Sequence, residues 1–144
     1  MTEDEQFMRL ALNEAMDAYE ADEVPVGAVV VLNGKVIARG HNLTETLKDV
    51  TAHAEMLAIT AAANGLGAKY LKNCTLYVTL EPCIMCIGAI MHSQIDRLVY
   101  GAKDPKKGYT LLERDFLPKN LKVEHGVLAQ ECSQILKDFF QEKR

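Results

Sequence analysis

The sequence specifies a β-hairpin close to its N-terminus. The apolar run of residues 26–32, opened by Pro25, is followed by Asn33-Gly34 and then by a second run over residues 35–39. Asparagine and glycine tolerate the positive φ angles that a two-residue hairpin turn requires at both of its positions. The two runs are therefore expected to pair as antiparallel strands.

Helix and strand patterns alternate along the rest of the chain. Thr2 and Glu5 have the spacing of a helix capping box, and apolar residues recur at helical spacing after them. The segment Cys74–Leu80 alternates leucine or valine with threonine or tyrosine, which is typical of a strand. The other expected elements are helices over about residues 3–19, 54–63, 82–92, 109–116 and 128–140, and strands over residues 97–102 and 121–125.

This order of elements predicts an α/β fold. Strands that alternate with helices form a sheet whose two faces are covered by helices. The last two strands are separated by about twenty residues that include a helix, which is enough for a parallel crossover. We therefore expect a single domain, residues 1–144, with a mixed five-stranded sheet in a three-layer α/β/α arrangement.

Composition and charge narrow the possible functions. The chain is 49% hydrophobic and 25% charged, which is typical of a globular domain. A net charge of −4 excludes nucleic-acid binding by bulk positive charge, although it is compatible with a local basic patch. The acidic start lacks the features of a secretory signal, and no apolar run reaches the roughly 20 residues of a membrane span. We expect a cytoplasmic protein that has no membrane partner.

Two short fragments carry residues suited to metal chemistry. Residues 51–55 contain His53 and Glu55, and residues 81–86 contain Cys83 and Cys86. Imidazole and thiolate are ligands that suit Zn²⁺, and a three-residue spacing at a helix start puts both sulfurs on one face. Three protein ligands leave one position of a tetrahedral zinc ion open, which is typical of a catalytic site. We expect one zinc ion per chain, bound by the histidine and the two cysteines.

Glu55 is placed to handle protons on a zinc-bound water. Two thiolates cancel the charge of Zn²⁺, so the bound water is less acidic than at a three-histidine site and needs a carboxylate base. A Cys-x-x-Cys pair also occurs in structural zinc sites and in redox pairs. Cys74 and Cys132 lie in apolar patterns without ligand spacing, however, and no thioredoxin-like pattern precedes Cys83.

The pairing of His-x-Glu with Pro-Cys-x-x-Cys resembles the signature of zinc nucleobase deaminases. Segments 23–28, 75–86 and 101–104, with Met-His-Ser at 91–93, resemble the bacterial tRNA-specific adenosine deaminases of the cytidine/deoxycytidylate deaminase superfamily over nearly the whole chain. The resemblance implies a cytidine-deaminase-like fold and the conversion of adenosine to inosine at the wobble position of a tRNA anticodon. Glu55 would deprotonate the zinc-bound water, and the hydroxide would attack C6 of a flipped-out adenine.

The resemblance also implies a set of substrate contacts. Asn42 would hydrogen-bond the target base, and Asp104 would accept a hydrogen bond from a ribose 2′-hydroxyl. Independently of the resemblance, Lys106, with Lys103 and Lys107, forms a basic loop beside the predicted site and is expected to contact phosphates. The expected partner is therefore a tRNA anticodon stem-loop, and DNA is not expected.

Other residues have less defined roles. Phe139 and Phe140 are consecutive, so one is expected to pack in the core and the other to lie near the substrate. His92 either complements a helix dipole or contacts RNA. Gln94 and Val50 stand where arginine and proline are common in the family.

Two alternative functions remain open at this stage. One is a free-base or nucleoside deaminase that acts on guanine, cytosine or cytidine. The other is a non-catalytic, zinc-bound RNA-binding module, which would have no need for a carboxylate such as Glu55 beside the metal.

The helix expected over residues 82–92 has almost no polar face. A helix that is apolar all round needs cover on both sides, whereas the sheet covers only one. We therefore expect a two-fold homodimer through the outer face of this helix, which the family resemblance also implies. Its apolar residues are Ile84, Met85, Ile87, Ala89, Ile90 and Met91.

Overall fold

The computed structural model describes residues 1–144 as five strands, four α-helices and one short 3₁₀-helix. The α-helices are α1 (Glu3–Glu20), α2 (Ala54–Leu66), α3 (Ile84–Ser93) and α4 (Ala129–Glu142). The strands are β1 (Gly27–Leu32), β2 (Lys35–His41), β3 (Cys74–Leu80), β4 (Arg97–Ala102) and β5 (Lys122–His125), with the 3₁₀-helix η1 (Tyr109–Leu111) between the last two. None of these helices combines the length and the apolar character needed to span a membrane.

All five strands form one mixed sheet in the order β2-β1-β3-β4-β5. β1 pairs antiparallel with β2 and β3, whereas β4 pairs parallel with β3 and β5. The predicted hairpin joins β1 to β2 through Asn33 and Gly34, whose φ angles are 53° and 74°. The predicted α/β fold and its mixed five-stranded sheet are confirmed.

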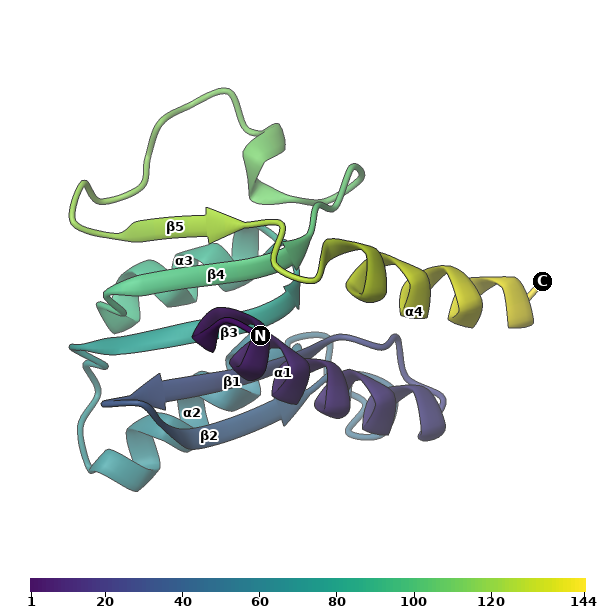
Figure 1. The fold of residues 1–144 in the computed structure, drawn as a ribbon, viewed down its shortest axis with the longest axis horizontal. Coiled ribbons are helices and arrows are strands. Elements are labelled where there is room, and N and C mark those ends of the chain that lie inside the picture. Colours follow the sequence, from purple (N-terminus) through teal and green to yellow (C-terminus); the bar gives the residue numbers. More distant parts are fainter.

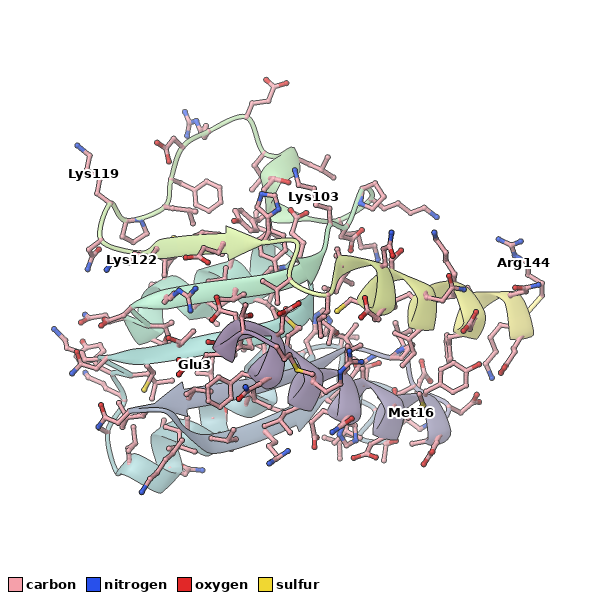
Figure 2. The ribbon with its side chains drawn as sticks, in the orientation of Figure 1. Glu3, Met16, Lys103, Lys119, Lys122 and Arg144 are labelled. Atoms are coloured by element: carbon pink, nitrogen blue, oxygen red, sulfur yellow. The ribbon has the colours of Figure 1, made fainter.

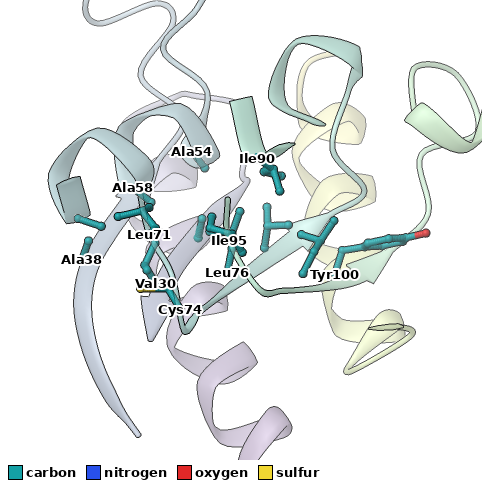
Figure 3. Packing of buried hydrophobic residues seen from close by; sticks show 14 of the residues in the cluster. Val30, Ala38, Ala54, Ala58, Leu71, Cys74, Leu76, Ile90, Ile95 and Tyr100 are labelled. Carbon is teal, nitrogen blue, oxygen red and sulfur yellow. The ribbon is translucent and has the colours of Figure 1, made fainter. Parts of the chain in front are cut away.

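Helices cover both faces of the sheet, as Figure 1 shows: α1 and α4 lie on one face, and α2 and α3 on the other. Successive strand residues point to opposite faces, and the two cores follow this alternation. Val29, Tyr77 and Val99 pack with α1 and α4. The core on the other face includes Val30, Ala38, Ala54, Ala58, Leu76, Ile90 and Tyr100 (Figure 3).

The backbone of α1 lies directly on the sheet. A Cβ atom added to Gly27 would lie 2.0 Å from the carbonyl oxygen of Ala11, so only glycine fits at the start of β1. The helix begins at the predicted capping box, in which the Glu5 N–H bonds the Thr2 hydroxyl and the Thr2 N–H bonds the Glu5 carboxylate. The close contact between Gly27 and Ala11 fixes the segment that leads from α1 into β1.

Two predicted helix boundaries are wrong. Residues 109–116 do not form a helix beyond η1: Tyr109 and Phe116 both face the core, with ring centroids 6.4 Å apart, and their spacing imitates one helix face. The helix α2 continues past residue 63 to Leu66, because Gly67 supplies the left-handed C-cap with a φ of 65°. The other predicted ends differ from the structure by a few residues at most.

Candidate functional site

The predicted metal ligands meet at one edge of the sheet. The carboxyl ends of the parallel strands β3 and β4 lie side by side, and antiparallel β1 begins at the same edge. Cys83 follows β3 directly and is the N-cap residue of α3, whereas His53 is the N-cap residue of α2. Neither side chain makes a hydrogen bond that caps its own helix. Both are therefore available as ligands.

The three side chains have the spacing of a zinc site. The Nδ1 atom of His53 lies 3.7 Å from Cys83 Sγ and 3.5 Å from Cys86 Sγ, and the three ligand atoms lie within 4.8 Å of one another. Zinc–sulfur and zinc–nitrogen bonds of ordinary length in a tetrahedral site separate nitrogen from sulfur by about 3.6 Å. The residues present therefore fit Zn²⁺.

Hydrogen bonds within this group favour a thiolate. Bonds from Cys86 and from His53 lower the pKa of Cys83 to about 3. The bond to Cys83, together with burial, raises the pKa of the Cys86 thiol. The hydrogen bond between His53 and Cys83 raises the pKa of His53. A group that already stabilises negative charge on sulfur is suited to a divalent cation.

Glu55 lies in the first turn of α2, two residues after His53, and is 4% exposed. Burial disfavours the charged carboxylate and raises its pKa to about 7. A carboxyl group with a pKa near neutrality is able both to accept and to donate a proton at that pH. Glu55 has the properties expected of a proton-transfer group.

A cavity of about 1050 Å³ opens beside these residues. Its walls include His53, Glu55 and Cys83 together with Asn42, Asp104 and Lys106, so the structure brings six of the seven predicted site residues to one cavity; Cys86 is fully buried behind them. Figure 2 shows Lys103 on the loop after β4 and Arg144 at the end of α4. The cationic residues along the cavity are Lys103, Lys106, Lys107, Lys137 and Arg144.

The predicted substrate residues are held by local hydrogen bonds. The Asn42 side chain donates to the Val24 carbonyl at 3.3 Å and accepts from the Thr44 N–H at 3.2 Å. These bonds fix its amide group and leave it one further N–H and one lone pair for a ligand.

Asp104 has a role inside its own loop. Its Oδ1 atom accepts the N–H groups of Lys106 at 3.0 Å and of Lys107 at 3.1 Å, which shapes the loop tip. The side chains of both lysines are exposed.

The two C-terminal phenylalanines divide as expected from their adjacency. Phe139 is 6% exposed and packs edge-on against Tyr19, whereas Phe140 is 48% exposed and lines the cavity. His92 is exposed at the end of α3 and does not line the cavity. Lys143 forms an ion pair with Asp22 and likewise does not line it.

Sequence reasoning missed two buried glutamates, Glu23 and Glu81. Glu23 is fully buried, and its carboxylate accepts the N–H groups of Glu45 and Thr46 at 3.0 and 2.6 Å and the Thr46 hydroxyl at 2.6 Å. It thus ties the end of α1 to the loop that follows Asn42. The available signal was a glutamate close to a proline at a strand end, as in Glu23-Val24-Pro25 and Glu81-Pro82.

Comparisons with known proteins agree with this geometry. The family model of MafB19-like deaminases matches residues 2–144. The tRNA-specific adenosine deaminase of Bacillus subtilis (strain 168) is 48% identical, over 100% of this chain and 92% of its own length. A solved structure from studies of A-to-I editing by tRNA:A34 deaminases superposes with a TM-score of 0.85 at 48% identity, over 91% of this chain and 99% of that one.

The chain belongs to the tRNA-specific adenosine deaminase family. It is therefore a deaminase, an enzyme that acts on a carbon–nitrogen bond, and the predicted family membership is confirmed. The same fold also occurs in a guanine deaminase from Nitrosomonas europaea, with a TM-score of 0.81 at 26% identity over 94% of this chain and 83% of that one.

Proposed function

We propose that this enzyme converts adenosine to inosine at the wobble position of a tRNA anticodon, with one zinc ion per chain. The observation that carries the proposal is the cavity in which Glu55 lies beside His53 and Cys83 under a basic rim. The names of the full-length relatives support tRNA as the substrate.

His53, Cys83 and Cys86 would hold the metal. Zinc bound by them would supply Lewis-acid chemistry that makes water a nucleophile near neutral pH. Because two of the ligands are thiolates, the metal centre carries little net charge, and proton transfer falls to the carboxyl group next to it.

Glu55 is the proton-transfer residue in this proposal. Its carboxylate accepts a proton from the attacking water and delivers it to N1 of the adenine. It then accepts the proton of the new C6 hydroxyl group and passes it to the amino group, which leaves as ammonia. A pKa of about 7 suits both directions of transfer at neutral pH. Asn42 orients the base through the donor and acceptor that its own hydrogen bonds leave unused.

The basic rim favours RNA over a free base. Lys103, Lys106 and Lys107 of the loop after β4 line the cavity, and so do Lys137 of α4 and Arg144, which follows α4. Five cations along one opening attract a polyanion, although the whole chain has a net charge of −4. Asp104 would contact a ribose hydroxyl. An anticodon loop already presents unpaired bases, so extruding the target base costs less than in a duplex.

Guanine is the second candidate substrate, because a guanine deaminase shares the fold. One experiment distinguishes the two candidate substrates. The zinc-loaded enzyme is incubated with a tRNA anticodon stem-loop and, in separate reactions, with guanine and with cytosine at equal concentration. We expect ammonia and inosine from the RNA and little product from either base. Efficient turnover of a free base with inert RNA would reverse the assignment.

We propose that the enzyme works as a homodimer through the outer face of α3. Ile87 and Ile90 are buried against the sheet, whereas Ile84 remains 64% exposed. Gly88 lies in the middle of this helix, where glycine destabilises by about 0.5–1 kcal/mol relative to alanine. A Cβ atom added there would contact nothing within 4 Å in this chain. Close approach of a second copy would explain a glycine that the monomer does not need.

Residues 1–144 are proposed to act as a single domain, because both cores pack against the same sheet. A tRNA substrate would place the reaction in the cytoplasm.

A further inference from the structure

A negative charge without a cationic partner is buried next to the metal-binding residues. Glu81 follows β3, precedes Cys83 by two residues, and is 2% exposed. It takes part in none of the ion pairs of the structure. A buried carboxylate is costly unless hydrogen bonds satisfy it, so its donors indicate what it is for.

All of the groups that donate hydrogen bonds to the Glu81 side chain belong to the loop that follows β4. The Asp104 N–H bonds Oε1 of Glu81 at 3.1 Å. The Thr110 N–H and hydroxyl bond Oε2 at 2.8 and 2.7 Å. One carboxylate therefore holds both ends of the loop, and each of its oxygens serves a different end.

The loop is also fitted closely to this carboxylate. Gly108 lies against it, and an added Cβ atom would be 2.2 Å from Oε2 of Glu81. The Tyr109 N–H bonds the carbonyl oxygen of Pro82 at 3.0 Å, beside the same carboxylate. The loop therefore packs closely against Glu81 and Pro82.

The tip of this loop carries residues that line the same cavity as His53 and Cys83. Asp104, Lys106 and Lys107 all line the cavity, and the Asp104 carboxylate arranges the two lysine backbones. Through Glu81 and Pro82, the position of these groups is set relative to Cys83.

We propose that Glu81 is a positioning residue for substrate binding: its carboxylate holds residues 103–110 at a fixed place relative to the metal ligands, so that the loop is ready to bind the RNA backbone. This inference rests on the proposed function, since it assumes that the loop contacts the substrate. If the loop is correctly placed for only a tenth of the time, the apparent dissociation constant rises about tenfold.

Glu81→Gln tests the role with little change of shape. An amide has only one acceptor oxygen, so it faces one end of the loop with an N–H group and loses that anchor. We expect the dissociation constant and the KM for an anticodon stem-loop to rise about tenfold. Metal content and kcat should stay within about twofold of the parent enzyme. The amides of residues 104 and 110 should exchange hydrogen faster, whichever substrate the enzyme uses.

Thr110 gives a milder test from the loop side, because its side chain is exposed. Thr110→Val removes the hydroxyl donor and should raise the KM, as Glu81→Gln does. Thr110→Ser keeps the donor and should have the KM of the parent enzyme. Glu113→Gln is the matched control: it removes an exposed carboxylate a few residues further along and should change none of these values.

The possible outcomes separate the alternatives. Loss of zinc and of kcat in Glu81→Gln, with an unchanged KM, would mean that Glu81 only supports Cys83, and would overturn the proposal. Unchanged hydrogen exchange at residues 104 and 110 would overturn it as well. If the parent enzyme does not deaminate the stem-loop, the proposed substrate fails, and the exchange measurement still decides whether Glu81 anchors the loop.

Discussion

The Nδ1 atom of His53 lies 3.5 Å from the Sγ atom of Cys86, although 33 residues separate the two in the sequence. This contact joins the start of α2 to the first turn of α3. We expect purified enzyme to contain about one zinc ion per chain, as one three-ligand site requires. Cys86→Ser should abolish zinc binding and lower the midpoint of thermal unfolding by about 5 °C or more, because metal binding is coupled to folding.

Elemental analysis and thermal denaturation measure both effects. Cys74→Ala is the control, since Cys74 is a buried cysteine of the core rather than part of the ligand group. The zinc content of the Cys74→Ala variant should equal that of the parent enzyme. A Cys86→Ser enzyme that retained stoichiometric zinc would show that the ligand set is different.

Glu55→Gln should separate proton transfer from metal binding. Glutamine keeps the size of the buried side chain but does not carry the proton, so kcat should fall by about 10²–10⁴-fold. Zinc content and unfolding temperature should be preserved, because no ligand is lost. Single-turnover deamination with elemental analysis on the same sample measures both. Turnover close to that of the parent would rule out Glu55 as the proton shuttle.

Removing positive charge from the loop should change the salt dependence of RNA binding. Lys106→Ala combined with Lys107→Ala should reduce the slope of log affinity against log salt by about one to two. Stability and zinc content should not change, because both lysine side chains are exposed. Lys119→Ala with Lys122→Ala, at the far end of the sheet in Figure 2, is the control of equal charge. Equal slopes for the two double variants would place the RNA elsewhere.

Gly88→Gln should affect the monomer and the dimer in opposite directions. Its side chain meets open space in one chain and replaces a poor helix former, so monomer stability should rise by about 0.5 kcal/mol. The same side chain would obstruct a second copy, and the dimer dissociation constant should rise at least tenfold.

Sedimentation velocity over a concentration series measures this association. Gly65→Gln is the matched control, because Gly65 is also helical and also borders open space, but in α2. A parent chain that sediments only as a monomer of 16.0 kDa at micromolar concentration would refute the dimer.

The pair Asp4–Arg97 should make stability depend on pH. The guanidinium of Arg97 donates to both carboxylate oxygens of Asp4, at 2.8 and 2.6 Å, and these bonds hold the pKa of Asp4 below its usual range. Because the folded pKa is depressed, this stabilisation is complete above the unfolded pKa of about 3.9 and is lost as pH falls through the folded value.

Asp4→Asn should therefore lower the free energy of unfolding by about 1–2 kcal/mol at pH 7. The difference between the two proteins should shrink below about pH 4. Urea denaturation of both proteins across this range is the measurement, and Glu3→Gln, an exposed neighbour, is the control. A difference that is independent of pH would contradict the assigned pKa.

The elements that the sequence predicted well have local causes. The hairpin depends on Asn33 and Gly34 themselves, and the start of α1 depends on the reciprocal bonds of Thr2 and Glu5. The helix predicted over residues 109–116 failed because Tyr109 and Phe116 are buried by tertiary packing on irregular backbone, which sequence spacing does not distinguish from a helix face.

The same distinction applies to the site. His53, Glu55, Cys83 and Cys86 could be proposed as site residues from the sequence because metal and proton chemistry restricts residue types at short spacings. Glu23 and Glu81 could not, because their partners are mainly backbone N–H groups, which every non-proline residue offers. Their role becomes visible only when the loops that they hold are seen to line one cavity.

The two faces of the sheet contribute differently to the cavity. His53, Glu55 and Cys83 come from the starts of α2 and α3, whereas Lys137 and Phe140 come from α4 on the opposite face, and Arg144 follows α4. The helices α2 and α3 pack into one hydrophobic core, and α4 packs into the other. For protein engineering, α4 is therefore the helix to diversify in a combinatorial library for altered substrate scope. Substitutions in α4 do not change the helix starts that carry His53, Glu55 and Cys83.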